Sequence, residues 1–507
     1  MKPINWLILF TISTMMFISC RKFLDQDPDS QATDQTTWKS EGDANSSVAA
    51  CYSLLRSALN ASITHYAYGD LPSDEFNSEF VSGGSNDSYK NVASMKWEGS
   101  IPPANSYVEL LKLRVYSNFY TTIAQANRCL HFLEPMPATV FAGNDAAAQQ
   151  AKKNQYIGEA YFVRAFAYFY MARVWGDVPL VTNYYPDVAT APQVARSPQK
   201  EILAQCIADL AQAKKYLPWK DDNNPDKIVR GDKGNAFALM AHVYAWSSNY
   251  DSCRMACDSV INSGSYSLVP ASDYLSIYKG QSPEGIFEIS NNQLKESLVA
   301  AQSIAGQTLA APYISNITTP LWQLNGGVVN NLFYDTTDLR FKKSFVTIAT
   351  GTSSFISCIK YSNIQYIDPS KQPQFTVAQN NIVIFRLADI KLLKAEAMAA
   401  GTNTDFGGAL AIVNEIRARA GLTTPLTGIT GRPLLDTITA ERGRELFLEG
   451  HRFYDLVRLA RNTGTVKFPF MTAGEFTAGK YYWPLDPSLF LTNSKLLQTP
   501  FWQGKLK

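Results

Sequence analysis

The segment ITAERGRELFLEGHRFYDLVRLAR, from Ile438 to Arg461, places acidic and basic side chains at helical spacing. Glu441, Glu445 and Glu449 recur every four residues, so they are expected on one face of a helix. Gly450 is expected to end that helix. The density of opposite charges over so short a stretch indicates contacts with other helices, and it makes this segment the strongest indication of the fold.

Paired carboxylates can also hydrolyse a glycosidic bond, but then they flank the sugar from two sides, about 5 or 6.5–9.5 Å apart. Acids on one face of one helix cannot do so. We therefore predict a structural ion-pair network, in which an upstream glutamate, Glu396, faces Arg417 and Arg419 of the following helix. The predicted members of this network are Glu396, Arg417, Glu445, Glu449, Arg452, Asp455 and Arg458.

The strongest helical periodicity elsewhere comes in pairs of segments. The pattern predicts helices over 153–175 and 197–217, over 232–247 and 250–263, and over 385–400 and 406–420. The second pair has small residues where its helices would cross, near the spacing of a degenerate tetratricopeptide unit. The blocks 64–107 and 269–379 lack this period and are rich in turn residues, so they read as loop-rich inserts where binding residues are usually found.

Composition limits the function classes. The chain has 507 residues, 46% of them hydrophobic and 12% aromatic, with 46 Lys and Arg against 44 Asp and Glu. The aromatic content and the formal charge of +2 argue against disorder. No basic block is present, so a nucleic-acid partner recognised mainly through its phosphates is not expected.

The first twenty residues read as a secretory signal. Lys2 precedes an apolar stretch from Trp6 to Ile18, which is too short to span a bilayer. Phe17-Ile18-Ser19-Cys20 resembles a bacterial lipobox, although Phe17 stands where Leu is usual; the alternative is an ordinary cleaved signal with an incidental Cys20. We predict a signal peptide over 1–19, lipidation at Cys20, and a polar tether over 20–37.

The other six cysteines are scattered, and the chain has only four histidines. Cys253 and Cys257 are four residues apart, but two ligands without a partner histidine make a poor zinc site. No phosphate-binding loop, dinucleotide fingerprint or nucleophile elbow occurs. We expect no metal, no cofactor and no enzymatic activity.

Several segments together resemble the SusD/RagB family. They are FLDQDP after Cys20, RAFAYFYMARVWGDVPLV (164–181), RLADIKLLKAEAMA (386–399), ALAIVNEIRARAGL (409–422), the 438–461 segment, and YYWPLDPSLFLTNSKLLQTPFW (481–502). The order is the same from Cys20 to the end. Relatives often carry Pro-Ile-Pro where Trp483-Pro484-Leu485 stands here, a difference confined to a loop.

The resemblance implies a mainly α fold, in which tetratricopeptide-like helix pairs support loop-rich inserts with minor β structure, as a single domain over 38–507. It also implies a lipid-anchored protein of the outer membrane that faces the cell exterior. Its partner would be a SusC-like TonB-dependent transporter, to which it delivers an oligosaccharide or polysaccharide. Some members of the family take peptides instead, so a peptide ligand is the alternative, and a surface glycosidase is a third reading that lacks cleft carboxylates.

A sugar site needs exposed aromatic rings flanked by polar groups, because sugars present flat CH faces and rings of hydroxyls. The two loop-rich blocks supply such residues, and the resemblance points to the same regions. We expect Trp97 and Trp322 to be exposed platforms on one face of the protein. The predicted ligand-binding residues are Trp97, Trp322, Tyr313, Tyr89, Asp74 and Asn105.

Overall fold

The computed structural model describes residues 34, 37–84, 87–99, 108–187, 191–291, 296, 298–299, 302–315, 317–350, 353–366 and 376–506. The predicted signal peptide, Cys20, most of the tether and Asn105 lie outside these ranges. In the part of the chain that is described, no helix has both the length and the apolar character needed to cross a membrane.

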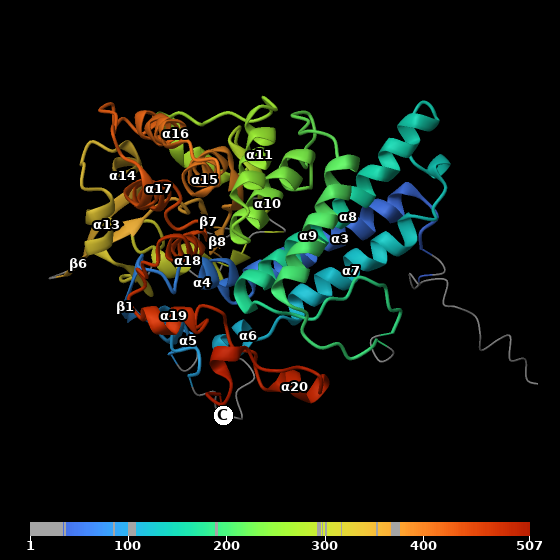
Figure 1. The fold of residues 1–507 in the computed structure, drawn as a ribbon, viewed down its shortest axis with the longest axis horizontal. Helices are drawn as coiled ribbons and strands as arrows, with labels where there is room; N and C mark the ends of the chain where they lie inside the picture. Colours follow the sequence, from blue (N-terminus) through green and yellow to red (C-terminus); the bar gives the residue numbers. More distant parts are fainter. Residues whose placement is uncertain are drawn as a thin grey trace, which may run out of the picture.

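Long helices form most of the structure (Figure 1). They are α3 (Glu41–Asn60), α7 (Ser117–Leu133), α8 (Ala146–Trp175), α9 (Gln199–Tyr216), α10 (Lys233–Trp246), α11 (Tyr250–Ile261), α15 (Leu387–Ala400), α16 (Phe406–Arg419), α17 (Gly431–Glu445) and α18 (Arg452–Thr463). From α7 to α11 each of these helices packs on the next one in the chain, and α11 then packs on α15, which contacts both α16 and α17. The mainly α fold of stacked helix pairs predicted from the sequence is confirmed.

The loop-rich blocks contain short elements. The short helices are η1 (Ala61–Ile63), α4 (Thr64–Gly69), α5 (Ser88–Ala93), α6 (Glu109–Leu113), η3 (Ala138–Val140), η5 (Ala271–Lys279), α12 (Ile304–Thr308), α13 (Gly326–Leu332), α14 (Leu339–Ser344), α19 (Ala473–Thr477), α20 (Ser488–Thr492) and η8 (Pro500–Trp502). The strands are β1 (Phe76–Val81), β2 (Gly285–Ile289), β3 (Leu298–Val299), β4 (Trp322–Leu324), β5 (Phe345–Thr350), β6 (Ser353–Cys358), β7 (Ile364–Tyr366), β8 (Thr376–Ala378) and β9 (Ile382–Arg386).

The strands form small antiparallel sheets, with β1 beside β4, β2 beside β9, β5 beside β6, and β8 between β3 and β7. In the β2–β9 sheet, Phe287 lies opposite Phe385 and Ile289 opposite Ile382. Every residue of these two strands is buried. Burial on both faces explains why the apolar residues of these strands do not alternate with polar ones; the two charged residues, Glu288 and Arg386, are buried as well.

The helix α8 shows how local sequence sets an element. Asp145 caps its start by accepting the Ala148 N–H at 2.8 Å, and Gly176 ends it with a φ of +73°. From Tyr156 to Trp175 almost every side chain is buried, because other helices and the β2–β9 sheet surround this half. The helix starts seven residues before the predicted Lys153.

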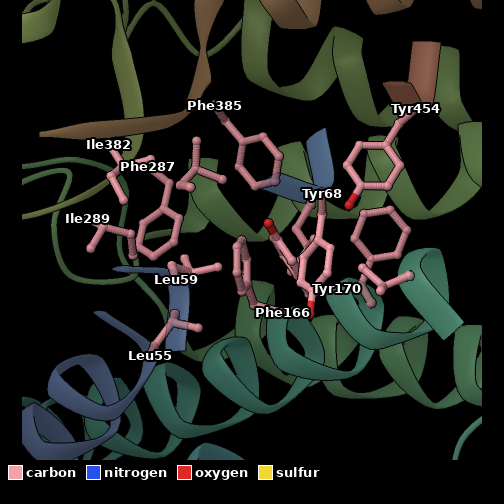
Figure 2. Close-up of a cluster of buried hydrophobic side chains, with 14 of the residues drawn as sticks. Leu55, Leu59, Tyr68, Phe166, Tyr170, Phe287, Ile289, Ile382, Phe385 and Tyr454 are labelled. Carbon is pink, nitrogen blue, oxygen red and sulfur yellow. The ribbon is translucent and has the colours of Figure 1, made fainter. Parts of the chain in front are cut away.

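The centre of the core lies between α8 and the loop-rich side (Figure 2). Phe166 of α8 meets Phe287 at a centroid distance of 5.5 Å and Phe385 at 6.3 Å, while Leu55 and Leu59 of α3 lie in the same cluster. Burial of each such side chain contributes about 1.5–3 kcal/mol to the free energy of folding. The helical scaffold and the small sheets therefore share one core.

Candidate functional site

The β1–β4 sheet is the part of the loop-rich side that carries the predicted ligand-binding residue Trp322. Val81 lies opposite Trp322 in this sheet, and both side chains are buried. Phe80, which precedes Val81 in β1, is 55% exposed, and Leu321, directly before β4, is 37% exposed. Alternation along a strand sends successive side chains to opposite faces. The sheet therefore presents apolar side chains to solvent above a buried indole.

Trp322 is completely buried, so the prediction that it is an exposed platform is wrong. Its ring meets the edge of Tyr89 at 4.8 Å and that of Phe76 at 5.7 Å. Tyr89 is itself only 5% exposed. The two predicted aromatic residues thus pack together beneath the sheet, because its short strands close over the inner face.

Trp97 is also completely buried, and the same prediction is wrong for it. Its ring stacks on Trp483 at a centroid distance of 4.4 Å and an angle of 10°, and its Nε1 donates to the Val92 carbonyl at 3.2 Å. Trp502 lies 6.0 Å away. Residues from the C-terminal segment cover this indole. That long-range packing cannot be read from the polar residues beside Trp97 in the sequence.

Two other predicted ligand residues have structural partners. Asp74 accepts two hydrogen bonds from Arg452, at 2.8 and 2.7 Å, which leaves its side chain 20% exposed. Tyr313 is half-buried against the core. The structure therefore does not form one open site from the predicted residues Trp97, Trp322, Tyr313, Tyr89 and Asp74. The exposed apolar residues Phe80 and Leu321 were not predicted from the sequence. Alternation in FNSEFV would place Phe80 on the same face as the buried Phe76, and the register shift between Phe76 and Val81, which the sequence does not reveal, changes that.

A buried cluster of ion pairs holds the loop-rich side to the helices. Glu445, at the end of α17, accepts from Arg386 at 2.6 Å and from Arg340 at 2.9 Å, and it also pairs with Arg419. Glu449 accepts from Arg386 at 2.8 Å and from Lys360 at 2.7 Å. We call Glu445, Glu449, Arg340, Lys360, Arg386, Arg419 and Glu284 the carboxylate hub.

The hub carboxylates are held ionised. Burial alone raises the pKa of Glu449, but Arg386 and Lys360 outweigh it and bring that pKa down to about 2. Burial likewise opposes ionisation of Glu445, and Arg419, Arg386 and Arg340 hold its pKa well below the usual range. Such carboxylates are poor general acids near neutral pH. They stabilise the fold and do not face a cleft from two sides.

A second cluster joins α15, α17 and α18. Arg442 donates to Asp389 and Asp455, both at 2.9 Å, while Arg458 donates to Asp455 at 2.7 Å. Glu396 pairs with Arg458 at 2.8 Å through both of its oxygens. Glu396 is thus buried and paired, but the predicted partners, Arg417 and Arg419, are wrong, because α18 lies closer to this face of α15 than those arginines do.

Helix α17 ends earlier than predicted. It stops at Glu445, so Glu449 lies in the following turn and not on the same helix face. The turn is tight at Gly450, whose φ is +79° and where an added Cβ would lie 2.2 Å from His65 Nε2. Its N–H donates to Asp70 at 2.7 Å. The loop block that begins at Thr64 is therefore anchored directly to this turn.

Asp70 and Glu75 are both buried, although they lie in a loop-rich block of the chain. Glu75 accepts the Leu448 N–H at 3.3 Å. Burial raises the pKa of Asp70 to about 8, and burial together with the nearby Asp70 raises that of Glu75. Both acids serve as backbone acceptors inside the protein.

The model of the SusD family matches residues 348–502, and a model described as starch-binding associating with outer membrane matches residues 22–245. SusD-like protein P38 of Formosa agariphila is 27% identical, with 98% of each chain covered. A SusD homolog from Bacteroides thetaiotaomicron has a structure with a TM-score of 0.75 and 26% identity, covering 91% of this chain and 98% of that one. A laminarin binding SusD-like protein has a TM-score of 0.69 and 21% identity, covering 91% and 99% of the two chains, which shows a shared fold.

Proposed function

Because this chain belongs to the SusD family, we propose that it binds an oligosaccharide or polysaccharide at the outer membrane and delivers it to a SusC-like TonB-dependent transporter. The observation that carries the proposal is the match of residues 22–245 to the family model described as starch-binding associating with outer membrane. The stacked helices give a rigid support, and the loop-rich side gives a surface on which a ligand can bind.

The proposed contact surface is the outer face of the β1–β4 sheet. Exposed apolar side chains can pack against the CH faces of sugar rings, and Phe80 and Leu321 are the exposed ones here. Gln323 lies in β4 and Asn325 caps the start of α13, and both are half-buried. Hydrogen bonds from such amides would orient the sugar.

We propose binding without hydrolysis. The acidic residues of the 438–461 segment support this view, because Glu441, Glu445 and Glu449 are all paired with arginine or lysine inside the protein. Release of reducing sugar from a bound polysaccharide would contradict it.

Binding can be tested by isothermal titration of the mature protein with starch, laminarin and a panel of peptides. The double variant Phe80→Ala/Leu321→Ala should weaken polysaccharide binding by about tenfold or more, a change of about 1.4 kcal/mol. Leu491→Ala is the matched control, since Leu491 is 87% exposed on the remote helix α20. If a peptide binds and none of the glycans does, the ligand class is peptide and the proposal of a sugar ligand is wrong.

The anchor and the partner need their own test. We propose that residues 1–19 are a signal peptide, that Cys20 is lipidated at the start of a tether over 20–37, and that 38–507 form one SusD-like domain facing the exterior. Several acyl chains on Cys20 would give stable anchoring. Cys20→Ala should release the protein from the outer-membrane fraction and abolish its co-purification with the transporter; membrane retention after a carbonate wash would contradict the anchor.

A further inference from the structure

A polar hollow of about 210 Å³ lies on the helical side of the molecule. Its walls come from α3, from α8, and from the segment 218–232 that joins α9 to α10. In Figure 1 these helices lie to the right, whereas β1 lies at the left edge of the protein. We call it the Trp219 hollow, after the tryptophan that lines it. It is separate from the β1–β4 sheet.

Trp219 differs from the other tryptophans of the described ranges, all of which are buried. It is half-buried, and its ring stacks on Phe237 at a centroid distance of 5.9 Å and an angle of 18°. The stack holds the indole in place while part of it remains open. A fixed, partly exposed aromatic ring beside a polar hollow is what packing against the apolar face of a small polar ligand requires.

The wall of the hollow contains an ion pair, Arg230 with Glu159, in which some hydrogen-bonding atoms have no partner. Arg230 Nε donates to Glu159 Oε2 at 2.7 Å, and Nη1 donates to Asn45 Oδ1 at 2.6 Å. Arg230 Nη2 and Glu159 Oε1 are buried and have no hydrogen-bond partner. The Glu159 side chain is only 1% exposed.

These two atoms are a donor and an acceptor on one ion pair. Leaving a buried polar atom without a hydrogen bond costs about 1–3 kcal/mol of folding free energy. A ligand that bonds to both Arg230 Nη2 and Glu159 Oε1 removes this cost, which favours its binding. Two neighbouring hydroxyl groups can do this, since one donates to the carboxylate and the other accepts from the guanidinium. Tyr52 is the other polar group near Glu159. Its hydroxyl accepts the Gly231 N–H at 2.7 Å and keeps its own proton for the Glu159 carboxylate, so a ligand hydroxyl would be a further donor to that carboxylate.

The charge and the volume of the Trp219 hollow restrict the class of ligand that it can hold. The lining contains four basic and four acidic residues, so its formal charges cancel and a strongly charged ligand gains little from it. The volume is below the range of about 300–1,000 Å³ usual for sites of drug-sized ligands. One small ring fits this description better than an extended chain. An adjoining cavity of about 430 Å³ shares Asn45, Asp226 and Arg230 and gives room for further units.

We propose that the Trp219 hollow is a second ligand site, which takes one uncharged pyranose ring, stacked on Trp219 with two neighbouring hydroxyls on Arg230 and Glu159. It is argued from the hollow alone and does not depend on the glycan surface proposed for the β1–β4 sheet. Such a site would hold a second stretch of the same polysaccharide, or a separate short sugar, on the helical side.

The test uses acrylamide quenching of tryptophan fluorescence in the mature protein, because the buried tryptophans of the described ranges are shielded from the quencher. The probes are methyl α-glucopyranoside, methyl β-galactopyranoside and methyl α-mannopyranoside, each titrated to its solubility limit. At least one should protect Trp219 from quenching. Trp219→Ala should abolish the quenchable signal. Glu159→Gln breaks the ion pair with Arg230 and should lower the melting temperature, so its protection is measured well below the melting temperature of that variant, where it should be weaker by about tenfold or more.

Tyr334→Ala is the control, because Tyr334 is an exposed aromatic residue, 67% accessible, outside the hollow. It should leave protection unchanged. Absence of protection by all three glycosides would show that the hollow holds water only, and protection by glycyl-lysine but by no glycoside would replace the sugar with a peptide; either overturns the proposal. Starch or laminarin binding that survives Trp219→Ala but not Phe80→Ala/Leu321→Ala leaves the function proposed above intact, so the two failures are distinguishable.

Discussion

Two arginines beside buried carboxylates show how differently the two sides of the molecule use the same chemistry. Arg386 in the carboxylate hub makes five hydrogen bonds, to Glu284, Glu445 and Glu449 and to the Glu445 carbonyl. Arg230 in the Trp219 hollow makes two and leaves Nη2 without a partner. A fully bonded arginine stabilises a fold, while a partly bonded one next to a hollow leaves capacity for a ligand.

The tryptophans follow the same division. Trp97 is covered by Trp483 and Trp502, and Trp322 by Tyr89 and Phe76. Trp219 has one aromatic partner and remains partly open. The comparison predicts that substitutions on the first side change stability and that those around the hollow change binding.

The largest effect is expected for Arg386→Ala. It removes the principal cation from three buried carboxylates, and breaking even one buried pair costs about 3–5 kcal/mol. We expect a loss of at least 5 kcal/mol, or no folded protein at all, in urea unfolding followed by circular dichroism. The matched variant Arg230→Ala should lose clearly less, since Arg230 makes a single ion pair that is partly open to solvent. Equal losses in the two variants would remove the distinction between hub and hollow.

Trp97→Ala should be the next most damaging change. Removal of a fully buried tryptophan leaves a cavity and costs about 3–5 kcal/mol. Trp219→Ala should cost less than about 1 kcal/mol, because that side chain is half-buried. Thermal unfolding of the two variants in parallel gives the comparison. Trp97→Ala with wild-type stability would mean that the indole is not the core residue described above.

Glu396→Ala tests the second ion-pair cluster. It leaves Arg458 with Asp455 as its remaining partner and should destabilise the protein by about 3 kcal/mol, at the low end of the range for a broken buried pair. Arg417→Ala should have a smaller effect, since Glu396 pairs with Arg458 and not with Arg417. If the two variants melted at the same reduced temperature, the original pairing of Glu396 with Arg417 would regain support.

Stability should also depend on pH, where the two kinds of buried acid act in opposite directions. Glu449 and Asp455 have pKa values lowered to about 2, so their contribution is present near neutral pH and is lost as pH falls from about 5 to 2. Asp70 has a pKa raised to about 8, so the folded state keeps a proton that the unfolded chain has released, and stability falls as pH rises from about 4 to 8. Asp70→Asn should flatten that decline in melting temperature. A steeper decline in the variant would assign the effect to another group.

The helix pairs could be predicted because their signals are local. Asp232 caps α10, Gly176 ends α8, and apolar residues recur at helical spacing in both. Helix ends were less certain: α17 stops at Glu445 because the backbone must turn at Leu448 and Gly450 to reach the loop block at Asp70. Gly450 marks a helix end in the sequence, but its neighbours do not show that Asp70 lies against it, so the earlier end of α17 at Glu445 could not be predicted.

The amino-acid sequence by itself determined the helical scaffold, the family, and the fact that the charges of the 438–461 segment form structural ion pairs. Only the tertiary structure decided which partner each charge takes and which aromatic rings stay open. Periodicity and capping depend on residues a few positions apart. Burial of Trp97 by Trp483, or exposure of Trp219 beside Arg230 and Glu159, depends on segments brought together from distant parts of the chain, because packing is set by contacts in space.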